Sequence, residues 1–141
     1  MSAEVRIAGA AWDAIVRHAA ESWPEECCGL LIGDGAAIVE ARPARNVATD
    51  PQRRFRIDPA DHFSALRSAR RSGWRVCGAY HSHPESAPTP SETDLAEAFD
   101  DEEFVHVIVR PGARPALADA EVAAYRFSGK NVVPARLVRV P

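Results

Sequence analysis

Few cysteines, a single lysine and the lack of a long apolar run set the first limits on this 141-residue sequence. No apolar run approaches the roughly 18 residues that a membrane span needs, so a transmembrane protein is excluded. Met1 to Arg6 show no basic stretch followed by an apolar one, and we expect no signal peptide. The cysteines are odd in number and two are adjacent, a poor disulfide framework that favours a reducing, cytoplasmic setting: Cys27, Cys28 and Cys77.

A basic excess and paired cysteine motifs are also absent. Lysine and arginine total 17 against 20 aspartate and glutamate residues, which argues against a nucleic-acid binder. No CxxC pair exists, so a structural zinc ribbon is not expected. The apolar share of 46% and charged share of 26% exclude a wholly disordered chain. The length suits one domain over residues 1–141, and the oligomeric state is left open.

Hydrophobic spacing and turn residues predict helices interspersed with strands. Apolar residues at helical spacing predict a helix over 11–23, and Asp58 with Pro59 starts a second one that ends near Ser72. A third helix is expected from Ser91 to about Asp100. Strands are predicted over 27–32, 36–42, 74–83, 104–110, 121–127 and 132–140. This alternation predicts an α/β or α+β domain around one mixed sheet.

Two histidines at the end of a predicted strand are the most informative feature. His81 and His83 lie two residues apart, and the strand period of 2 directs both imidazoles to the same face. Asp94 follows one turn into the next helix, close enough to supply a third ligand. Two imidazoles and a carboxylate form a catalytic zinc set that leaves the fourth position to water. Zinc lowers the pKa of bound water from 15.7 to about 7.

That water needs a base that lies near the metal without binding it. Glu25 and Glu26, just before the predicted strand 27–32, are the candidates. Strand alternation places Glu26 on the same side as Cys28 and Leu30. Periodicity alone does not choose between the two glutamates.

The complete pattern resembles the JAMM metallopeptidase family, also called JAB or MPN-plus. The downstream pattern H-x-H-x7-S-x2-D is filled by His81, His83, Ser91 and Asp94. The upstream pattern P-x-E-x-C-G is filled by residues 24–29 and places the family's base on Glu26 rather than Glu25. A match of several parts at fixed spacing is far more specific than H-x-H alone.

The resemblance implies a three-layer α-β-α sandwich around a mixed, curved sheet, the cytidine-deaminase-like MPN/JAB fold. It implies Zn²⁺ held by His81, His83 and Asp94, with Glu26 as the base and Ser91 helping to hold the oxyanion. The implied activity is hydrolysis of an amide or isopeptide bond after the C-terminal glycines of a ubiquitin-like protein. The compact chain is most similar to small prokaryotic members that act on sulfur carrier proteins and release an amino acid, such as cysteine, or a C-terminal extension.

Each residue also has a plainer interpretation. Ser91 through Asp94 after Pro90 resembles a helix N-cap, and capping and catalysis are compatible. Cys28 is expected to pack in the core, Glu85 to be solvated, and His106 to be a satisfied core histidine. We expect the segments 43–54 and 84–90 to flank the cleft.

A non-catalytic MPN scaffold is the alternative function, and the intact ligand set argues against it. Other zinc hydrolase motifs, H-E-x-x-H and the deaminase pattern, are absent from the sequence.

Overall fold

Seven strands and three α-helices make up the part of the chain that the structure, a computed structural model, describes: residues 4–97, 101–112, 117–129 and 131–141. The helices are α1 (Gly9–Ser22), α2 (Pro59–Arg71) and α3 (Glu92–Glu97), with a short 3-10 turn at Leu117–Asp119. The strands are β1 (Glu4–Ala8), β2 (Cys28–Gly33), β3 (Ile38–Ala44), β4 (Arg75–Ser82), β5 (Val105–Arg110), β6 (Glu121–Ser128) and β7 (Asn131–Val140). None of the described helices is long and apolar enough to cross a membrane.

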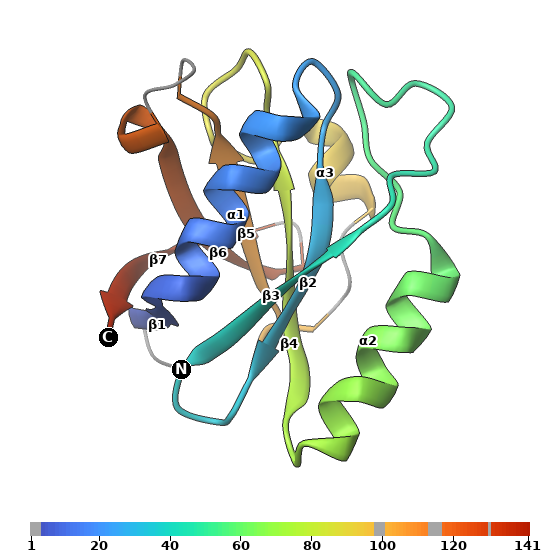
Figure 1. Cartoon of the computed structure of the whole chain (residues 1–141). Helices are drawn as coiled ribbons and strands as arrows, with labels where there is room; N and C mark the ends of the chain where they lie inside the picture. Colours follow the sequence, from blue (N-terminus) through green and yellow to red (C-terminus); the bar gives the residue numbers. More distant parts are fainter. Residues whose placement is uncertain (1–3, 98–100, 113–116, 130) are drawn as a thin grey trace.

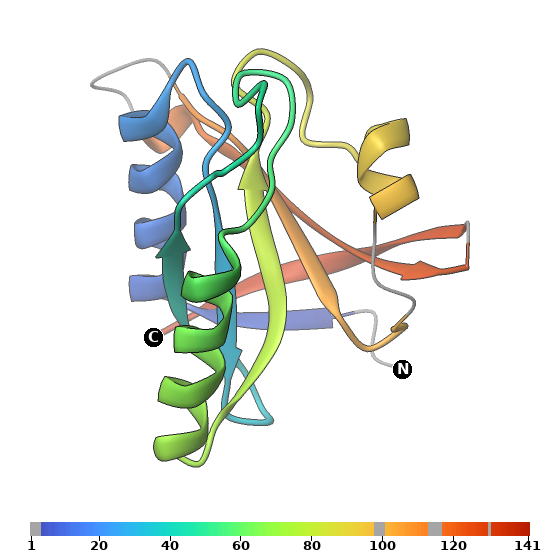
Figure 2. The same cartoon turned by 90° about the vertical axis from the view of Figure 1, so that its right-hand side faces the viewer.

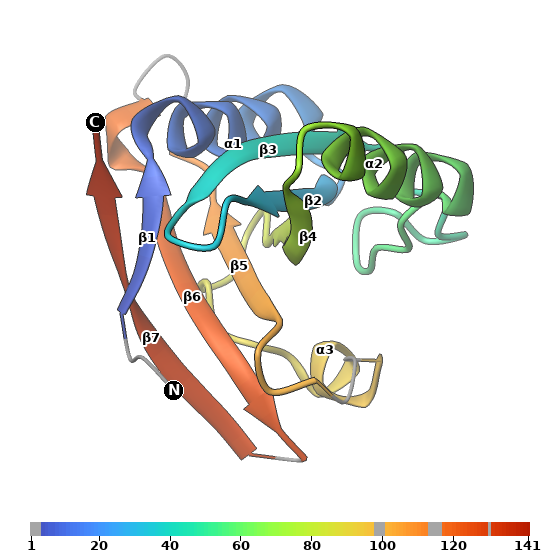
Figure 3. The ribbon, with the colours of Figure 1, turned by 90° about the horizontal axis from the view of Figure 1, so that it is seen from below.

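The strands form one mixed sheet that curves until it closes. Their order is β1-β3-β2-β4-β5-β6-β7, and β1 pairs in parallel with both β7 and β3 (Figure 1). The curvature appears most clearly from below, where β5, β6, β7 and β1 bend away from the flatter part formed by β2, β3 and β4 (Figure 3). The predicted mixed sheet is therefore present, and its closure through the amino-terminal strand was not predicted.

Helices α1 and α2 cover opposite faces of the flatter part of the sheet (Figure 3). The larger apolar cluster joins α1 to one face, with Ile15, Leu31 and Tyr80 all buried within it. The smaller cluster joins α2 to the other face through Leu30, Ile32, Ala65 and Ala69. Helix α3 stands apart from both, beyond the end of β4 (Figure 2).

Local sequence signals account for most of these elements. Asp58 caps α2 by accepting a 2.9 Å hydrogen bond from the Ala60 N–H, and Pro59 occupies the first helical position, as predicted. The predicted hairpins form as β2 with β3 and β6 with β7. The third predicted helix is present over Glu92–Glu97, and the rest of its predicted length, positions 98–100, lies outside the described residues. The strand β1 was missed.

Alternation along β4 sorts its side chains between the two faces. Tyr80 points to the α1 side, where its hydroxyl lies 2.8 Å from Nδ1 of His18. Ala79 and His81 therefore point to the opposite side, which α2 and α3 share. The sheet thus separates the α1 core from the site that the histidines form.

Gly78 allows β4 to lie close to β5, and we expect its replacement to destabilise the protein. A Cβ atom there would lie 2.3 Å from the backbone oxygen of Val105, which cannot move without disturbing the strand. Urea unfolding of Gly78→Ala should show a loss of about 1–3 kcal/mol. Gly9→Ala is the matched control, since its Cβ would approach the flexible Arg139 side chain at 3.3 Å and would meet backbone only at an ordinary contact distance of 3.7 Å, from the Val140 oxygen. Equal stability of the two variants would contradict this account.

Candidate functional site

The side chains of His81, His83 and Asp94 converge at the junction of β4 and α3. Nε2 of His81 lies 3.1 Å from Nε2 of His83, and each nitrogen lies 3.2 Å from Oδ2 of Asp94. These residues form the one group of metal-ligand type found among the described residues. Both histidines are buried, so the cluster is shielded from bulk water.

The donor set fits a zinc ion. Ligand atoms bound to a tetrahedral zinc at about 2.0–2.1 Å are separated by about 3.3–3.4 Å. The three observed separations, 3.1–3.2 Å, approach this to within a few tenths of an ångström. Imidazole nitrogens suit zinc, and three protein ligands leave one position of a tetrahedral ion for water or substrate.

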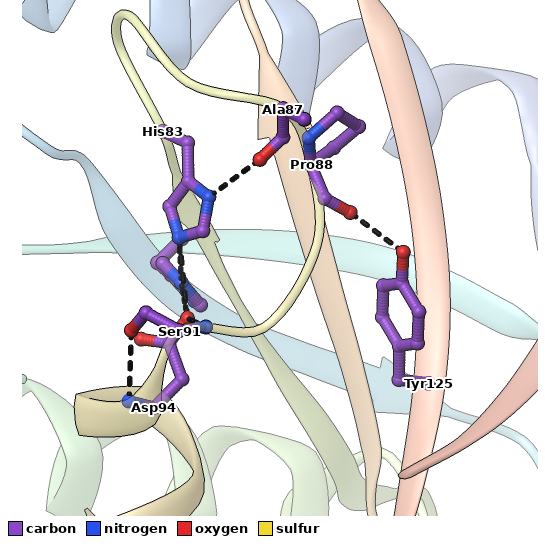
Figure 4. Close-up of polar contacts among 7 residues, drawn as sticks. His83, Ala87, Pro88, Ser91, Asp94 and Tyr125 are labelled. Carbon is purple, nitrogen blue, oxygen red and sulfur yellow. Dashed lines mark hydrogen bonds and ion pairs between the residues drawn. The ribbon is translucent and has the colours of Figure 1, made fainter.

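A second set of hydrogen bonds orients the histidine and carboxylate donors (Figure 4). Nδ1 of His83 donates to the carbonyl of Ala87 at 2.8 Å, which leaves the lone pair of Nε2 facing the cluster. Tyr125 donates its hydroxyl hydrogen to the carbonyl of Pro88 at 2.7 Å and so secures the same loop. Two adjacent carbonyls of the loop are thereby held, one by the residue that follows β4 and the other by β6.

Ser91 and Asp94 exchange hydrogen bonds at the start of α3 (Figure 4). The Ser91 hydroxyl oxygen accepts from the Asp94 N–H at 3.0 Å, and Oδ2 of Asp94 accepts from the Ser91 N–H at 2.9 Å. The capping interpretation of Ser91 is therefore confirmed. Its hydroxyl hydrogen is still available as a donor, so capping does not prevent a further role.

The electrostatics of the cluster favour a cation. Burial opposes ionisation of Asp94, but hydrogen bonds from the two histidines outweigh it and hold the Asp94 pKa well below its usual range. Burial lowers the pKa of His81 and so favours the neutral imidazole that a metal requires. The site combines an ionised carboxylate with at least one neutral histidine.

Glu26 is buried beside this cluster, whereas Glu25 is exposed. Only 7% of Glu26 is accessible, and burial raises its pKa from 4.5 to about 7. The charge of His83 opposes this rise and that of Asp94 adds to it. Periodicity could not choose between Glu25 and Glu26, whereas the structure distinguishes them by burial. Glu26, which the family pattern selects as the base, lies next to the histidines.

A cavity of about 570 Å³ opens beside the cluster, with His81 and Asp94 in its wall. Val47, Ala48, Thr49 and Arg54 contribute from the segment 43–54, as expected. The segment 84–90 contributes no residue to the wall. The other lining residues come from the sheet, from α2, from the end of the connection between β3 and α2, and from the residue before β5: Leu30, Phe55, Arg56, Ile57, His62, Ala79, Phe104, His106 and Phe127.

The interpretation of His106 as a satisfied core histidine is wrong. Its ring stacks on Phe127 at 4.2 Å, yet its buried Nε2 makes no hydrogen bond within the described part of the chain. Strand alternation identified its face but could not show what its nitrogens meet. Cys28, by contrast, is fully buried, as expected, with Sγ 3.6 Å from the carbonyl oxygen of Arg45.

Sequence reasoning missed two residues that support the site. Ser82, between the two histidines, is fully buried and its hydroxyl accepts from the Cys27 N–H at 2.7 Å, which ties β4 to the residue after Glu26. Asn46 lies in the segment 43–54 that is expected to flank the cleft, but its hydrogen bonds to the backbone of Glu26 and Arg54 appear only in the structure.

Known proteins share this architecture and motif. The family profile described as prokaryotic homologs of the JAB domain matches residues 9–127. The chain belongs to this JAB family. Desampylase of Haloferax volcanii is 38% identical over 119 residues, which cover 80% of this chain and 85% of that protein. CysO-cysteine peptidase of Mycobacterium tuberculosis is 30% identical over 120 residues, covering 82% of this chain and 77% of that protein.

A solved structure has the same fold as this chain. A JAB1/MPN domain protein from Archaeoglobus fulgidus superimposes with a TM-score of 0.61 at 20% identity and covers 98% of each chain. The predicted α+β fold of the JAB/MPN type is therefore confirmed. Together with the relatives, it establishes this JAB protein as a JAMM-type hydrolase.

We expect the chain to bind zinc through the converging donors. Replacing Asp94 by Asn removes the anionic ligand but keeps an oxygen for the Ser91 N–H. Equilibrium dialysis should show that the affinity for zinc falls by more than about 10–100-fold. A loss of about 10–100-fold is typical when only a residue that hydrogen-bonds to a metal ligand is removed. Glu85→Gln is the matched control, since this exposed carboxylate lies in the loop beside the cluster and should leave binding unchanged. Equal affinities would exclude Asp94 as a ligand.

The buried Glu26 should make the stability of the metal-free protein depend on pH. Its pKa is higher in the folded state, about 7, than the ordinary 4.5, so its stabilising contribution is complete below pH 4.5 and is lost as pH rises through 7. Relative to Glu26→Gln, the wild type should lose about 3 kcal/mol over this interval. Urea unfolding in EDTA measures the difference. If the stability of wild type and Glu26→Gln changed with pH in parallel, the prediction would be wrong. Glu25→Gln is the control, because it makes the same change at an exposed position.

Proposed function

We propose that this JAB protein is a zinc metallopeptidase that cleaves the amide or isopeptide bond following the C-terminal glycines of a ubiquitin-like or sulfur carrier protein. The observation that carries the proposal is the buried Glu26 beside the converging donors of His81, His83 and Asp94. A base with a pKa near neutrality next to a metal-ligand set is an arrangement suited to metal-assisted hydrolysis of an amide. We treat residues 1–141 as one catalytic domain.

Zinc is the cofactor we propose, with His81, His83 and Asp94 as its ligands. When bound, it would supply Lewis acidity that activates water and polarises the scissile carbonyl. The chain contributes the imidazoles of His81 and His83 and the ionised carboxylate of Asp94, and it fixes His83 and Asp94 through Ala87 and Ser91.

Glu26 is proposed to act as the general base. Its carboxylate accepts a proton from the attacking water and then delivers it to the leaving amine. Both steps need a group that is ionised in part of the population near neutral pH, and burial raises the Glu26 pKa to about 7. Because Glu26 is not one of the proposed ligands, its loss should leave the metal in place.

Ser91 is proposed to stabilise the charge that develops on the carbonyl oxygen. Its hydroxyl oxygen is fixed by the Asp94 N–H at 3.0 Å, and this hydrogen bond leaves the hydroxyl hydrogen free to donate to substrate. One such donor contributes about 3–4 kcal/mol to the transition state. The helix cap and the oxyanion donor are thus the same hydroxyl group.

The relatives and the cavity support the proposed substrate class. One relative is named desampylase and another CysO-cysteine peptidase. The cavity beside His81 and Asp94 offers about 570 Å³ to the residues next to the scissile bond. We propose release of an amino acid, such as cysteine, or of a C-terminal extension. Free thiols at Cys27, Cys28 and Cys77 support a cytoplasmic setting.

The proposal is tested by incubating the zinc-loaded protein with sulfur carrier proteins that bear a C-terminal cysteine or a short peptide extension. Mass spectrometry should show loss of the extension after the terminal glycines. Cleavage that persists after complete removal of zinc would overturn the metallopeptidase proposal. A zinc-loaded protein that cleaves none of these conjugates would overturn the proposed substrate class.

Replacement of Glu26 should abolish turnover and leave zinc binding intact. Glu26→Gln keeps the side-chain shape but removes the base, so kcat should fall by about 10²–10⁴-fold. Glu25→Gln is the matched control, because it makes the same change at the exposed neighbouring position and should retain activity. Conjugate cleavage and metal analysis measure the two properties. A Glu26→Gln variant with unchanged turnover would remove Glu26 from the mechanism.

A further inference from the structure

The segment 47–56 forms a compact loop whose ends meet beside the site. Asn46 and Ile57 form an isolated antiparallel bridge, and the Val47 N–H donates to the Arg56 carbonyl at 2.8 Å. Within the loop, the Arg54 N–H donates to the carbonyl of Asp50 at 3.1 Å. Closed ends and internal hydrogen bonds are typical of loops with a defined shape.

The side-chain amide of Asn46 sits at the centre of this loop. Its Nδ2 group donates to the carbonyls of Glu26 at 3.0 Å and Arg54 at 3.1 Å. Its Oδ1 atom accepts from the N–H groups of Ala48 and Arg56, both at 3.0 Å. The amide therefore uses two donors and two acceptor positions, which is the full capacity of the group.

These hydrogen bonds attach the loop to Glu26 at both of its backbone polar groups. The Glu26 N–H donates to the carbonyl of Pro51 at 2.7 Å, and the Glu26 carbonyl accepts from Asn46. The backbone of Glu26 is thus held by the loop on one side. On the other side, Ser82 holds the N–H of the next residue, Cys27.

The same loop reaches the histidine cluster through Phe55. The Phe55 ring stacks on the imidazole of His81, with ring centroids 4.3 Å apart and planes inclined by 18°. Phe55 and the neighbouring Arg54 and Arg56 also line the cavity beside the cluster. One loop therefore contacts both Glu26 and a proposed zinc ligand.

We propose that Asn46 is a positioning residue whose side-chain amide holds the loop 47–56 in the shape that fixes Glu26 and His81 relative to each other. Its influence on the reaction rests on the proposed function of the site. Asn46 itself touches no reacting atom, so its effect is transmitted through the Glu26 backbone and the Phe55 ring. Misplacement of a catalytic group by about 1 Å costs on the order of 10²-fold in rate.

Asn46→Asp tests this proposal with almost no change in side-chain size. The substitution keeps an acceptor for Ala48 and Arg56 but turns the donor nitrogen into an anionic oxygen that faces the carbonyls of Glu26 and Arg54. Gln52→Glu is the matched control, since it makes the same amide-to-carboxylate change at an exposed position of the same loop.

The first measurement separates kcat from KM in folded, zinc-loaded protein with a sulfur carrier protein bearing a C-terminal cysteine. Asn46→Asp should lower kcat by about 10²-fold with a smaller change in KM, and Gln52→Glu should resemble the wild type. A decrease in kcat that only follows the fraction of unfolded protein would overturn the proposal, because a purely structural residue would behave in this way.

The second measurement needs neither metal nor substrate. In the zinc-free protein, the stacked Phe55 ring should shift the NMR signals of the His81 ring protons upfield, and Asn46→Asp should return these signals toward ordinary values. Unchanged His81 signals in Asn46→Asp would overturn the proposal about Asn46. A wild type that cleaves no conjugate would count only against the proposed function, and the NMR comparison would still test the role of Asn46. If Asn46→Asp does not fold, Asn46→Ala gives the same comparison without a new charge.

Discussion

The reciprocal hydrogen bonds between Ser91 and Asp94 determine where the carboxylate meets the two imidazoles. They begin helix α3 and aim Oδ2 of Asp94 at the nitrogens that the end of β4 presents. Three acceptor atoms this close together in a buried place are unfavourable unless protons or a cation join them. The loop secured by Tyr125 and the carbonyl of Ala87 keeps them together. The geometry of the whole site therefore follows from one helix cap placed a fixed distance beyond one strand.

The buried carboxylate of Glu26 is a second constraint on the site. Its burial lowers the stability of the folded protein but favours proton transfer. Burial makes its charged form unfavourable and so brings its pKa into the range that proton transfer needs. The surrounding structure offsets this cost by bonding the Glu26 backbone through Pro51 and Asn46. The carboxylate itself can then stay unfavourably placed. Rigid backbone support beneath a destabilised functional group is a general property of catalytic sites.

The local features of this fold could be predicted from sequence, and the long-range ones could not. Asp58 and Pro59 identify the start of α2 because capping depends on a few adjacent residues. The convergence of His81, His83 and Asp94 could be predicted because it depends on short stretches of chain, the end of one strand and the first turn of the next helix. Strand β1 was missed because Val5 and Ile7 are too few apolar residues to set a period, and its pairing with β7 joins opposite ends of the chain. The hydrogen bonds of Asn46 could not be predicted because its partners lie up to 20 residues away and are backbone groups.

The closure of the sheet is uneven around its circumference. Strand β1 pairs with β7 at five positions, from Glu4 to Ala8, but with β3 only at Ile7 and Ile38. We therefore expect thermal breathing of the barrel to begin at the seam between β1 and β3, because opening it breaks the fewest ladder contacts. Such breathing leaves β4 paired with β2 and β5, so the histidine-bearing strand keeps its neighbours while the ring opens. A tag or truncation that disturbs β1 would accordingly loosen the barrel before it disturbs the catalytic geometry.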